Sequence, residues 1–549
     1  MGKESGQNRV DMKPDVEKFR LRRFVERLVE AGEVEVIDRR VSLAEVSPIV
    51  EKVSRAVLFR SVGPEQVELV SAVMGSRKRM ALALGVEEDK ASDEFIRRLE
   101  NPHPVVEISS ADAPVHQVVL TGNKADVSKL PFHPQHEFDG GVYISSGIDF
   151  TVDPETGMTN IGCRRLSMRG RYECTTNVTG RSHLRATYMA ALKRGERLPI
   201  SYIVGSHPLD FMASSIRAAR TDELKYLGGF RGEPVPLVKC ATNDIRVPAD
   251  AEIVIEGYLD ERGYIEPEGP YGEYMGYYGP MHLDPIFHVT GITMRKDPLH
   301  QSLFHGVGKV LGRTDAVHMS ALRIEAEAKR LLRLVGIDVV AAWQPLYGGE
   351  MQHLRVAIRQ TAPGQAKHVI STLFGAIPSL KHIFVVDEDI DVRSDDAMEW
   401  ALGTRFQANR DLMIMEGMHG MKMDPSLRGQ VLGSKAGFDC TREVGQKKAV
   451  TTLVPAAKQF AKSHKDRGKT VEQVLSSGPH FFTHLMEEVG SDDGRDVTLA
   501  LEDLRNQGKI GRDADGRYYL MASEKGRTAM VGPRGHDPQM EDGASVPRL

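Results

Sequence analysis

The chain has 549 residues, of which 41% are hydrophobic and 27% are charged. These fractions are typical of globular proteins and argue against extensive disorder, while the length suggests about three or four domains. The 72 Lys and Arg residues nearly balance the 76 Asp and Glu residues, and the net charge is -4. This balance excludes a global field that would recruit nucleic acid or anionic lipid.

The sequence carries no signal for a membrane or for an oxidising compartment. No apolar run approaches the roughly 18 residues that a membrane helix needs. The first residues are polar and lack the apolar stretch of a secretory signal. The sequence has only four cysteines, Cys163, Cys174, Cys240 and Cys440, and no two of them form a CxxC pair. This argues against a disulfide framework or a thiolate zinc site. We expect a protein of the reducing cytoplasm.

The N-terminal part predicts a mixed α/β domain over residues 1–117. After a polar lead of about a dozen residues, apolar side chains from Leu21 onward recur at helical spacing, which predicts an amphipathic helix ended by Gly32. Val34 and Val36 then alternate with acidic residues, which predicts a half-buried strand.

Residues 118–325 contain short β-prone runs separated by Gly, Pro and Asp, a pattern typical of an antiparallel sheet or a small barrel. The runs are YISSGIDFTV, ECTTNV, PISYIVG, AEIVIEGYL and IFHVTGITM. Two helical stretches interrupt them, HLRATYMAALKRG and PLDFMASSIRAAR. From 326 to 455, strand and helix patterns alternate, which predicts βαβ units and a partly parallel sheet.

Residues 456–549 predict a basic linker, a small folded unit and a Gly-, Pro- and charge-rich disordered tail. Helical patterns followed by a hairpin, with Asp515 and Gly516 at its turn, resemble a winged-helix fold. A winged helix can bind DNA, but the third helical segment has only Arg505 and Lys509 as clear cations. We therefore favour a protein-contact or substrate-covering role over nucleic-acid binding.

The most unusual segment is EGPYGEYMGYYGP, residues 268–280. Glu268 and Glu273 flank a Gly-Pro-Tyr-Gly turn that can direct both acids into one cavity. Two carboxylates in one site favour different protonation states, so one can hold a proton near neutrality while a nearby arginine neutralises the other. The alternative is a solvated turn with two surface acids.

A second segment, TNIGCRRLSMRGR, offers Asn160 as a hard ligand for a divalent cation and Arg165 as a partner for a carboxylate or phosphate. Their odd spacing places them on opposite faces of a strand unless a bulge intervenes. The alternative is an exposed basic strand. With His183 and Glu223, Asn160 would form a mixed site suited to Mn, Mg or Fe, although each residue alone also fits an ordinary structural role.

Three further segments carry weaker signals. GVGKVLG, residues 306–312, departs from the GxGxxG pattern, so we do not interpret it as a nucleotide-binding loop. The dense methionines from Met413 to Met423 predict core packing or an adaptable pocket. The segment GSKAGFDCT, residues 433–441, offers Lys435 on a Gly-rich turn, either as a phosphate contact or within a plain loop.

Together these segments resemble the UbiD-like decarboxylases, which use prenylated FMN, from about residue 50 to 445. The blocks that carry the resemblance are GSRKRMALALG, TNIGCRR, GGFRGEPVPLVKCATNDIRVPADAEIVIEGYL, EGPYGEYMGYYG and GSKAGFDCT. The resemblance implies an N-terminal α/β domain, a split β-barrel flavin-binding domain over 118–325 and an α/β oligomerisation domain over 326–455. It also implies a homo-oligomer, either a dimer or a hexamer, and a flavin prenyltransferase that supplies the cofactor.

The resemblance further implies roles for individual residues. The implied catalytic set is Arg165, Glu268 and Glu273. The implied ligands of a divalent metal (Mn, Mg or Fe), beside a potassium ion, are Asn160, His183 and Glu223. The implied cofactor-binding residues are Asn160, Ile161, Arg165, Ser182, His183, Ala213, Ser214, Ile216, Glu223 and Lys435.

The implied activity is the non-oxidative, reversible decarboxylation of an aromatic or α,β-unsaturated carboxylic acid. Prenylated FMN would serve as a covalent electron sink and Glu273 as the proton donor. Because the basic linker can meet an anionic substrate, the alternative substrate is an aromatic acyl-CoA such as phthaloyl-CoA. The alternative of another class is a DNA-binding regulator with a degenerate, ligand-sensing enzyme domain, and the intact catalytic set argues against it.

Overall fold

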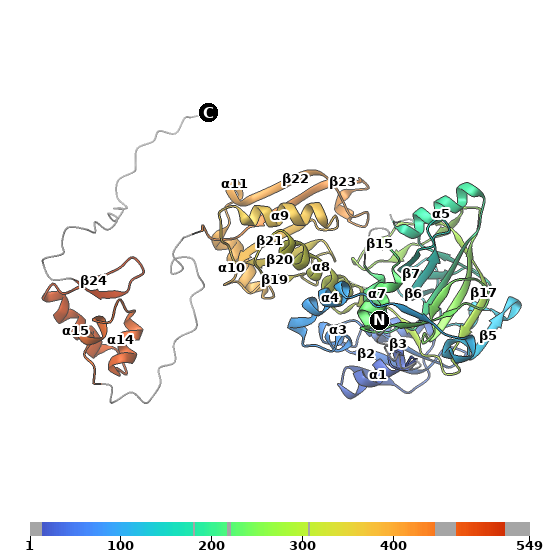
Figure 1. Ribbon diagram of the computed structural model, residues 1–549, viewed down its shortest axis with the longest axis horizontal. Coiled ribbons are helices and arrows are strands. Elements are labelled where there is room, and N and C mark those ends of the chain that lie inside the picture. Colours follow the sequence, from blue (N-terminus) through green and yellow to red (C-terminus); the bar gives the residue numbers. More distant parts are fainter. Residues whose placement is uncertain are drawn as a thin grey trace, which may run out of the picture. The chain divides into compact units, whose positions relative to one another are not determined.

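The computed structural model describes residues 14–178, 180, 182–216, 221–305, 308–444 and 468–521 (Figure 1). The chain divides into two compact units, one ending at Val444 and the other beginning at Gly445. The predicted N-terminal lead, most of the basic linker and the C-terminal tail lie outside the described residues. Within the described ranges, no helix is long and apolar enough to cross a membrane.

The first unit begins with helices packed around a four-stranded sheet of order β1-β2-β3-β18. The predicted amphipathic helix is present, and it buries Leu21, Phe24, Val25 and Leu28. Strand β18 joins this sheet from much later in the chain, pairing in parallel with β3. The elements are α1 (Leu21–Glu30), β1 (Val34–Ile37), α2 (Val46–Val50), β2 (Ala56–Val62), β3 (Val67–Ser71), α3 (Arg77–Leu84), α4 (Ala91–Glu100) and β18 (His300–Ser302).

The centre of the unit is a closed antiparallel barrel of six strands, in the order β12-β9-β6-β7-β8-β17, with β17 returning to β12 and β5 added outside β17. Closure removes the exposed sheet edges, and the side chains that point inward form a buried core. The strands are β5 (Val118–Thr121), β6 (Tyr143–Val152), β7 (Thr159–Met168), β8 (Glu173–Thr176), β9 (Leu198–Val204), β12 (Ile253–Leu259) and β17 (Ile286–Met294). The predicted barrel is therefore confirmed.

Helices and short strands around the barrel carry much of the site. A buried Arg231 on α7 binds Asp210 on α6 at 2.8 Å and Asp250 at 2.7 Å, which ties these helices together. The helices are α5 (His183–Arg194), α6 (Pro208–Ser214) and α7 (Leu224–Arg231). The strands are β4 (Val105–Glu107), β10 (Val235–Lys239), β11 (Arg246–Pro248), β13 (Glu266–Glu268), β14 (Tyr271–Gly272), β15 (Tyr278–Gly279) and β16 (His282–Asp284).

The C-terminal part of the unit is a five-stranded sheet of order β19-β20-β21-β23-β22, in which β20, β21 and β23 are parallel and both edge strands are antiparallel. This agrees with the predicted partly parallel sheet. Helix α8 crosses residue 326 and packs against β19 and α9. The elements are α8 (Asp315–Leu334), β19 (Val339–Trp343), β20 (His353–Ile358), α9 (Gln365–Ala376), β21 (His382–Asp387), α10 (Asp395–Arg405), α11 (Ala408–Asp411), β22 (Leu412–His419) and β23 (Leu432–Asp439).

The second unit is described over residues 468–521. It has three helices followed by an antiparallel hairpin, and its core includes Val474, Leu485, Leu501 and Tyr518. Its assignment to the winged-helix class stays a prediction. The elements are α13 (Val471–Leu475), α14 (Phe482–Val489), α15 (Arg495–Asn506), β24 (Ile510–Arg512) and β25 (Tyr518–Leu520).

Closure of the barrel depends on a glycine at a bulge in β12. The register between β12 and β17 shifts at Gly257, where an added Cβ would lie 1.9 Å from the carbonyl oxygen of His288. We expect Gly257→Ala to lower the free energy of unfolding by about 1–3 kcal/mol, because backbone atoms must move apart. Chemical denaturation measures this, with Gly170→Ala as the control, since an added Cβ at the exposed Gly170 meets no atom within 4 Å. Equal stability of the two variants would contradict the packing argument.

Candidate active site

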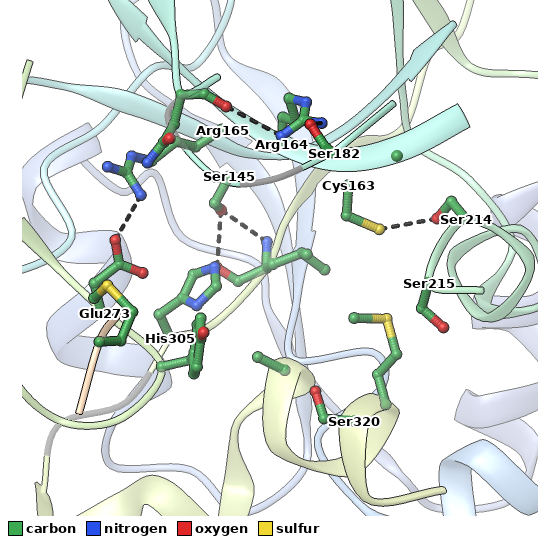
Figure 2. Close-up of a pocket in the computed structure, with 18 of the residues that line it drawn as sticks. Ser145, Cys163, Arg164, Arg165, Ser182, Ser214, Ser215, Glu273, His305 and Ser320 are labelled. Atoms are coloured by element: carbon green, nitrogen blue, oxygen red, sulfur yellow. Dashed lines mark hydrogen bonds and ion pairs between the residues drawn. The ribbon is translucent and has the colours of Figure 1, made fainter. Parts of the chain in front are cut away.

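A cavity of about 810 Å³ lies within the first unit (Figure 2). One wall is strand β7 from Asn160 to Arg165, and further lining comes from the hairpins around Glu273 and from helix α8 at Ser320. Figure 2 shows Arg165 and Ser182 on one side of this cavity and Ser320 on the opposite side. The volume lies within the roughly 300–1,000 Å³ typical of sites for small molecules and cofactors.

Arg165 binds both acids of the EGPYGE segment. Its Nε and Nη2 atoms donate to the two carboxylate oxygens of Glu268, each at 2.8 Å, and its Nη1 atom donates to Oε1 of Glu273 at 2.8 Å. The side chain of Glu268 is 2% exposed and that of Glu273 is 9% exposed. The two acids are therefore not surface groups of a solvated turn, and of the two only Glu273 lines the cavity.

The surroundings keep Arg165 charged and oriented. Burial alone would lower its pKa, but its hydrogen bonds to Glu268 and the charges of both acids raise the pKa of Arg165 above its ordinary value. The guanidinium lies over the ring of Tyr271, 4.2 Å from the ring centre, and Tyr271 donates its hydroxyl to Gln135 at 2.6 Å. A bidentate, stacked guanidinium is held in one geometry that a lysine could not reproduce.

Asn160 and Arg165 line the same cavity despite their odd spacing, as do the four residues between them, and strand β6 is bulged opposite Arg165. Ile144 on β6 pairs with Leu166 on β7, and Gly147 pairs with Arg164, so two β6 residues oppose Arg165 alone. The bulged strand is β6, and such a bulge bends and twists that strand locally.

The three implied metal ligands meet at another part of the cavity. Glu223 accepts hydrogen bonds from Nδ2 of Asn160 at 2.8 Å and from the backbone N–H of Ile161 at 2.7 Å, and its other oxygen lies 3.3 Å from Nδ1 of His183. Burial raises the pKa of the Glu223 carboxyl. Oδ1 of Asn160 is buried and has no hydrogen-bond partner among the described residues. This oxygen, an imidazole and a carboxylate suit a divalent cation, so the donor set fits the expected metal.

Most of the other implied cofactor contacts adjoin this trio, but one does not. The Ser182 side chain caps α5 by accepting a hydrogen bond from the backbone N–H of Arg185. Oγ of Ser214 lies 2.9 Å from Sγ of Cys163. Ile161, Ser182, Ser214 and Ile216 line the cavity, whereas Ala213 is buried beside them in α6. Lys435 is not among the lining residues, and its amino group donates to the carbonyl of Pro378 at 2.8 Å.

The structure also brings residues to the site that the sequence analysis missed. They are His282 and His305 beside the catalytic set, and Ser320, Arg323 and Glu350 at the C-terminal domain. Ser320 and Arg323 looked like polar residues of an ordinary amphipathic helix, and Glu350 follows a Gly-Gly pair typical of a solvated loop. Met423 lines the cavity, whereas Met413 packs on the C-terminal core. Residues 306 and 307 of the GVGKVLG segment lie outside the described residues.

Comparison with known proteins identifies the family. Residues 106–308 match the 3-octaprenyl-4-hydroxybenzoate carboxy-lyase Rift-related domain (UbiD), residues 317–440 match the C-terminal domain of the same carboxy-lyase, and residues 25–99 match its N-terminal domain. The chain belongs to the UbiD family of carboxy-lyases, and the predicted family and enzyme class are thereby confirmed.

Several relatives are named as decarboxylases. The chain is 30% identical to the anhydromevalonate phosphate decarboxylase of Methanosarcina mazei over 430 residues, which cover 78% of this chain and 97% of that protein. It is 29% identical to the UbiD-class enzyme HmfF from Pelotomaculum thermopropionicum, which was solved in complex with FMN. The TM-score is 0.75, and the match covers 79% of this chain and 97% of HmfF. It is 26% identical to the vanillic acid decarboxylase of Sedimentibacter hydroxybenzoicus, with a TM-score of 0.70 and coverage of 80% and 95%.

Removal of the Arg165 guanidinium should destabilise the fold in a pH-dependent way. In Arg165→Met, two buried carboxylates lose their countercharge, which we expect to cost about 3–5 kcal/mol of unfolding free energy. The loss should be smaller at about pH 5 than at about pH 8, because protons can neutralise the acids in place of the guanidinium. Denaturation at both pH values measures this. The control is Arg333→Met, whose ion pair with Asp93 is half exposed and should contribute about 1 kcal/mol or less. A pH-independent loss would argue against two buried, charged acids.

Proposed function

We propose that the protein is a prenylated-FMN-dependent decarboxylase that removes CO₂, without oxidation and reversibly, from an aromatic or α,β-unsaturated carboxylic acid. The observation that carries the proposal is the buried clamp of Arg165 on Glu268 and Glu273, beside a cavity whose other lining includes the donor set of Asn160, His183 and Glu223. The relative HmfF has been solved with FMN and, in an evolved dimeric form, with prFMN.

The phosphate end of the flavin would lie at the trio of Asn160, His183 and Glu223. A divalent metal held there would neutralise the phosphate, and a potassium ion would lie beside the end of α6 at Ser214. The backbone N–H of Ile161 already binds Glu223, so this carboxylate is held in position before any cation arrives. The prediction that Lys435 contacts the cofactor has no support from its position in this structure.

The residues of the clamp have separate tasks in the proposed reaction. Arg165 attracts and orients the substrate carboxylate. Glu268 fixes the guanidinium by accepting hydrogen bonds from its Nε and Nη2 atoms. When bound, the prenylated flavin supplies the electron sink that no side chain offers. Apolar lining side chains such as Met319 and Leu303 give the departing CO₂ a weakly polar exit. Glu273 first takes up a proton from solvent and then transfers that proton to the carbon that lost CO₂, which returns Glu273 to the carboxylate.

Other predictions keep the status of proposals. A homo-oligomer is supported by exposed apolar side chains on the C-terminal domain, among them Leu334 at 72%, Val431 at 61% and Ile414 at 57% exposure. The acyl-CoA alternative depends on the basic linker, most of which lies outside the described residues. The DNA-binding alternative is disfavoured by a catalytic clamp that is intact and buried.

The decisive test of the proposed function is Glu273→Gln in protein co-expressed with a flavin prenyltransferase. We expect CO₂ release from a panel of aromatic and α,β-unsaturated acids to fall by about 10²- to 10⁴-fold, because the amide cannot donate the proton. The flavin absorption spectrum should be retained. The matched control is Glu261→Gln, whose side chain is 42% exposed. Turnover at the parental rate in the Glu273 variant would refute the acid assignment.

The proposed metal site can be tested without turnover. We expect Mn²⁺ titrated calorimetrically into flavin-free protein to bind at least about tenfold more weakly to His183→Ala and Glu223→Gln, because each removes one of three ligands. Loading with FMN should fall in the same variants and after chelation with EDTA. His288→Ala is the control, since His288 pairs with Asp260 at 2.9 Å and is not among the lining residues of the cavity. Unchanged Mn²⁺ affinity in both variants would exclude this site.

A further inference from the structure

One group of polar residues in the cavity has no task in the proposed reaction. Ser320 projects from α8 into the cavity on the side opposite Arg165 (Figure 2). Its hydroxyl donates to Oε1 of Glu350 at 2.5 Å. Arg323 follows three residues later on the same helix face and also lines the cavity. These residues come from α8 and from the loop before β20, so they are separate from the barrel that carries the clamp.

Glu350 is an unusual acid. It is 3% exposed, and its Oε2 atom is buried without a hydrogen-bond partner among the described residues. Glu350 and the next residue, Met351, both have left-handed backbone conformations, with φ of 36° and 56°. Such conformations are strained for residues other than glycine, and a strained pair that places an acid in a cavity suggests a functional purpose.

Arg323 provides positive charge beside this acid. It is 7% exposed; its Nη1 atom donates to Glu327 at 3.3 Å and its Nη2 atom lies 3.0 Å from Sδ of Met351. Lys422, from the loop after β22, lines the same cavity. Two cationic side chains therefore line the cavity together with Glu350, and the charge of one of them, Arg323, acts on Glu350 directly.

The charge state of Glu350 follows from its surroundings. Burial raises its pKa to about 8, with the charge of Glu273 acting in the same direction and that of Arg323 and the hydroxyl of Ser320 opposing it. His305, which also lines the cavity, is neutral because burial lowers its pKa to about 3. At neutral pH, the carboxyl group of Glu350 is therefore mostly protonated and can donate a hydrogen bond.

We propose that Ser320, Arg323 and Glu350 form a subsite that binds a second anionic group of the substrate, a carboxylate or a phosphate. The inference rests on the proposed function, in which Arg165 binds the carboxylate that leaves. The guanidinium and the carboxyl O–H of Glu350 are both donors, and an oxyanion accepts from both. The substrate is then an acid with an anionic group at each end, and these residues determine specificity rather than catalyse.

The test compares matched acids with one and two anionic groups. The probes are trans,trans-muconate against sorbate, and terephthalate and 4-phosphonobenzoate against 4-methylbenzoate. CO₂ release by the flavin-loaded enzyme gives kcat/KM, and calorimetry on flavin-free protein gives affinity. We expect the parent to favour the dianions, and Glu350→Ala and Arg323→Gln each to reduce that preference by about tenfold or more while the monoanions change little. The carboxylate and phosphonate probes distinguish the two kinds of second group.

The protonation of Glu350 adds a second readout. As pH rises through about 8, the carboxyl group loses its donor proton and becomes a negative charge, so KM for dianions should rise while KM for monoanions stays constant. Glu350→Gln keeps a neutral donor, so it should retain the preference at about pH 7 and lose its pH dependence. The control is Glu399→Gln, an exposed acid on α10.

The outcomes separate the subsite from the proposed function. Release of CO₂ from monoanions with no preference for any dianion in rate or affinity overturns the subsite and leaves the decarboxylase. No CO₂ from any acid overturns the proposed function, while calorimetry on the same pairs still decides the subsite. A dianion preference that persists in Glu350→Ala and Arg323→Gln assigns the second group to other residues and overturns the proposal. Thermal melting of each variant shows whether it is folded, and Arg323→Gln replaces Glu350→Ala if that variant is not.

Discussion

The site depends on one buried electrostatic interaction, the pairing of the Arg165 guanidinium with the carboxylates of Glu268 and Glu273. None of these three groups is stable in a dry environment alone, because a buried charge without a partner costs several kcal/mol. Arg165 stands on a closed barrel, whereas the acids stand on hairpins about a hundred residues later. The charge of Arg165 on the barrel therefore stabilises the buried acids of the EGPYGE segment, and the charges of these acids stabilise the buried guanidinium.

The same dependence extends outward from the clamp. Strand β7 carries both Arg165 and Asn160, and both residues line the cavity. Glu223 immediately precedes α7, and the buried Arg231 at the other end of that helix binds Asp210 on α6, the helix that ends at Ser214. A buried ion pair outside the cavity thus fixes the distance between two helices whose ends form the proposed metal and phosphate region. Rigid elements, rather than loops, position the donor set.

The two halves of the cavity come from different parts of the fold. The barrel and its hairpins supply the clamp and the donor trio, while α8 and the loop before β20 supply Ser320, Arg323 and Glu350. Relatives that share the fold are named for acids as different as anhydromevalonate phosphate and vanillic acid. If the proposed function is correct, a reaction centre on the barrel with an opposite wall from another part of the fold would allow such variety, because the wall could change without disturbing the buried charges.

The sequence alone indicated the strands of the central domain and the partly parallel C-terminal sheet, because alternation is a local property that needs no partner. The six residues of the clamp and trio were named only through the resemblance to the UbiD-like decarboxylases, and their roles stay predictions. Tertiary structure decided which of the two alternatives, open sheet or barrel, was correct, and it decided that Asn160 and Arg165 line one cavity. It alone revealed Glu350, since a glutamate after two glycines has the pattern of a solvated loop. Whether an acid is hydrated or buried is a property of what packs over it, and that packing comes from residues distant in the chain.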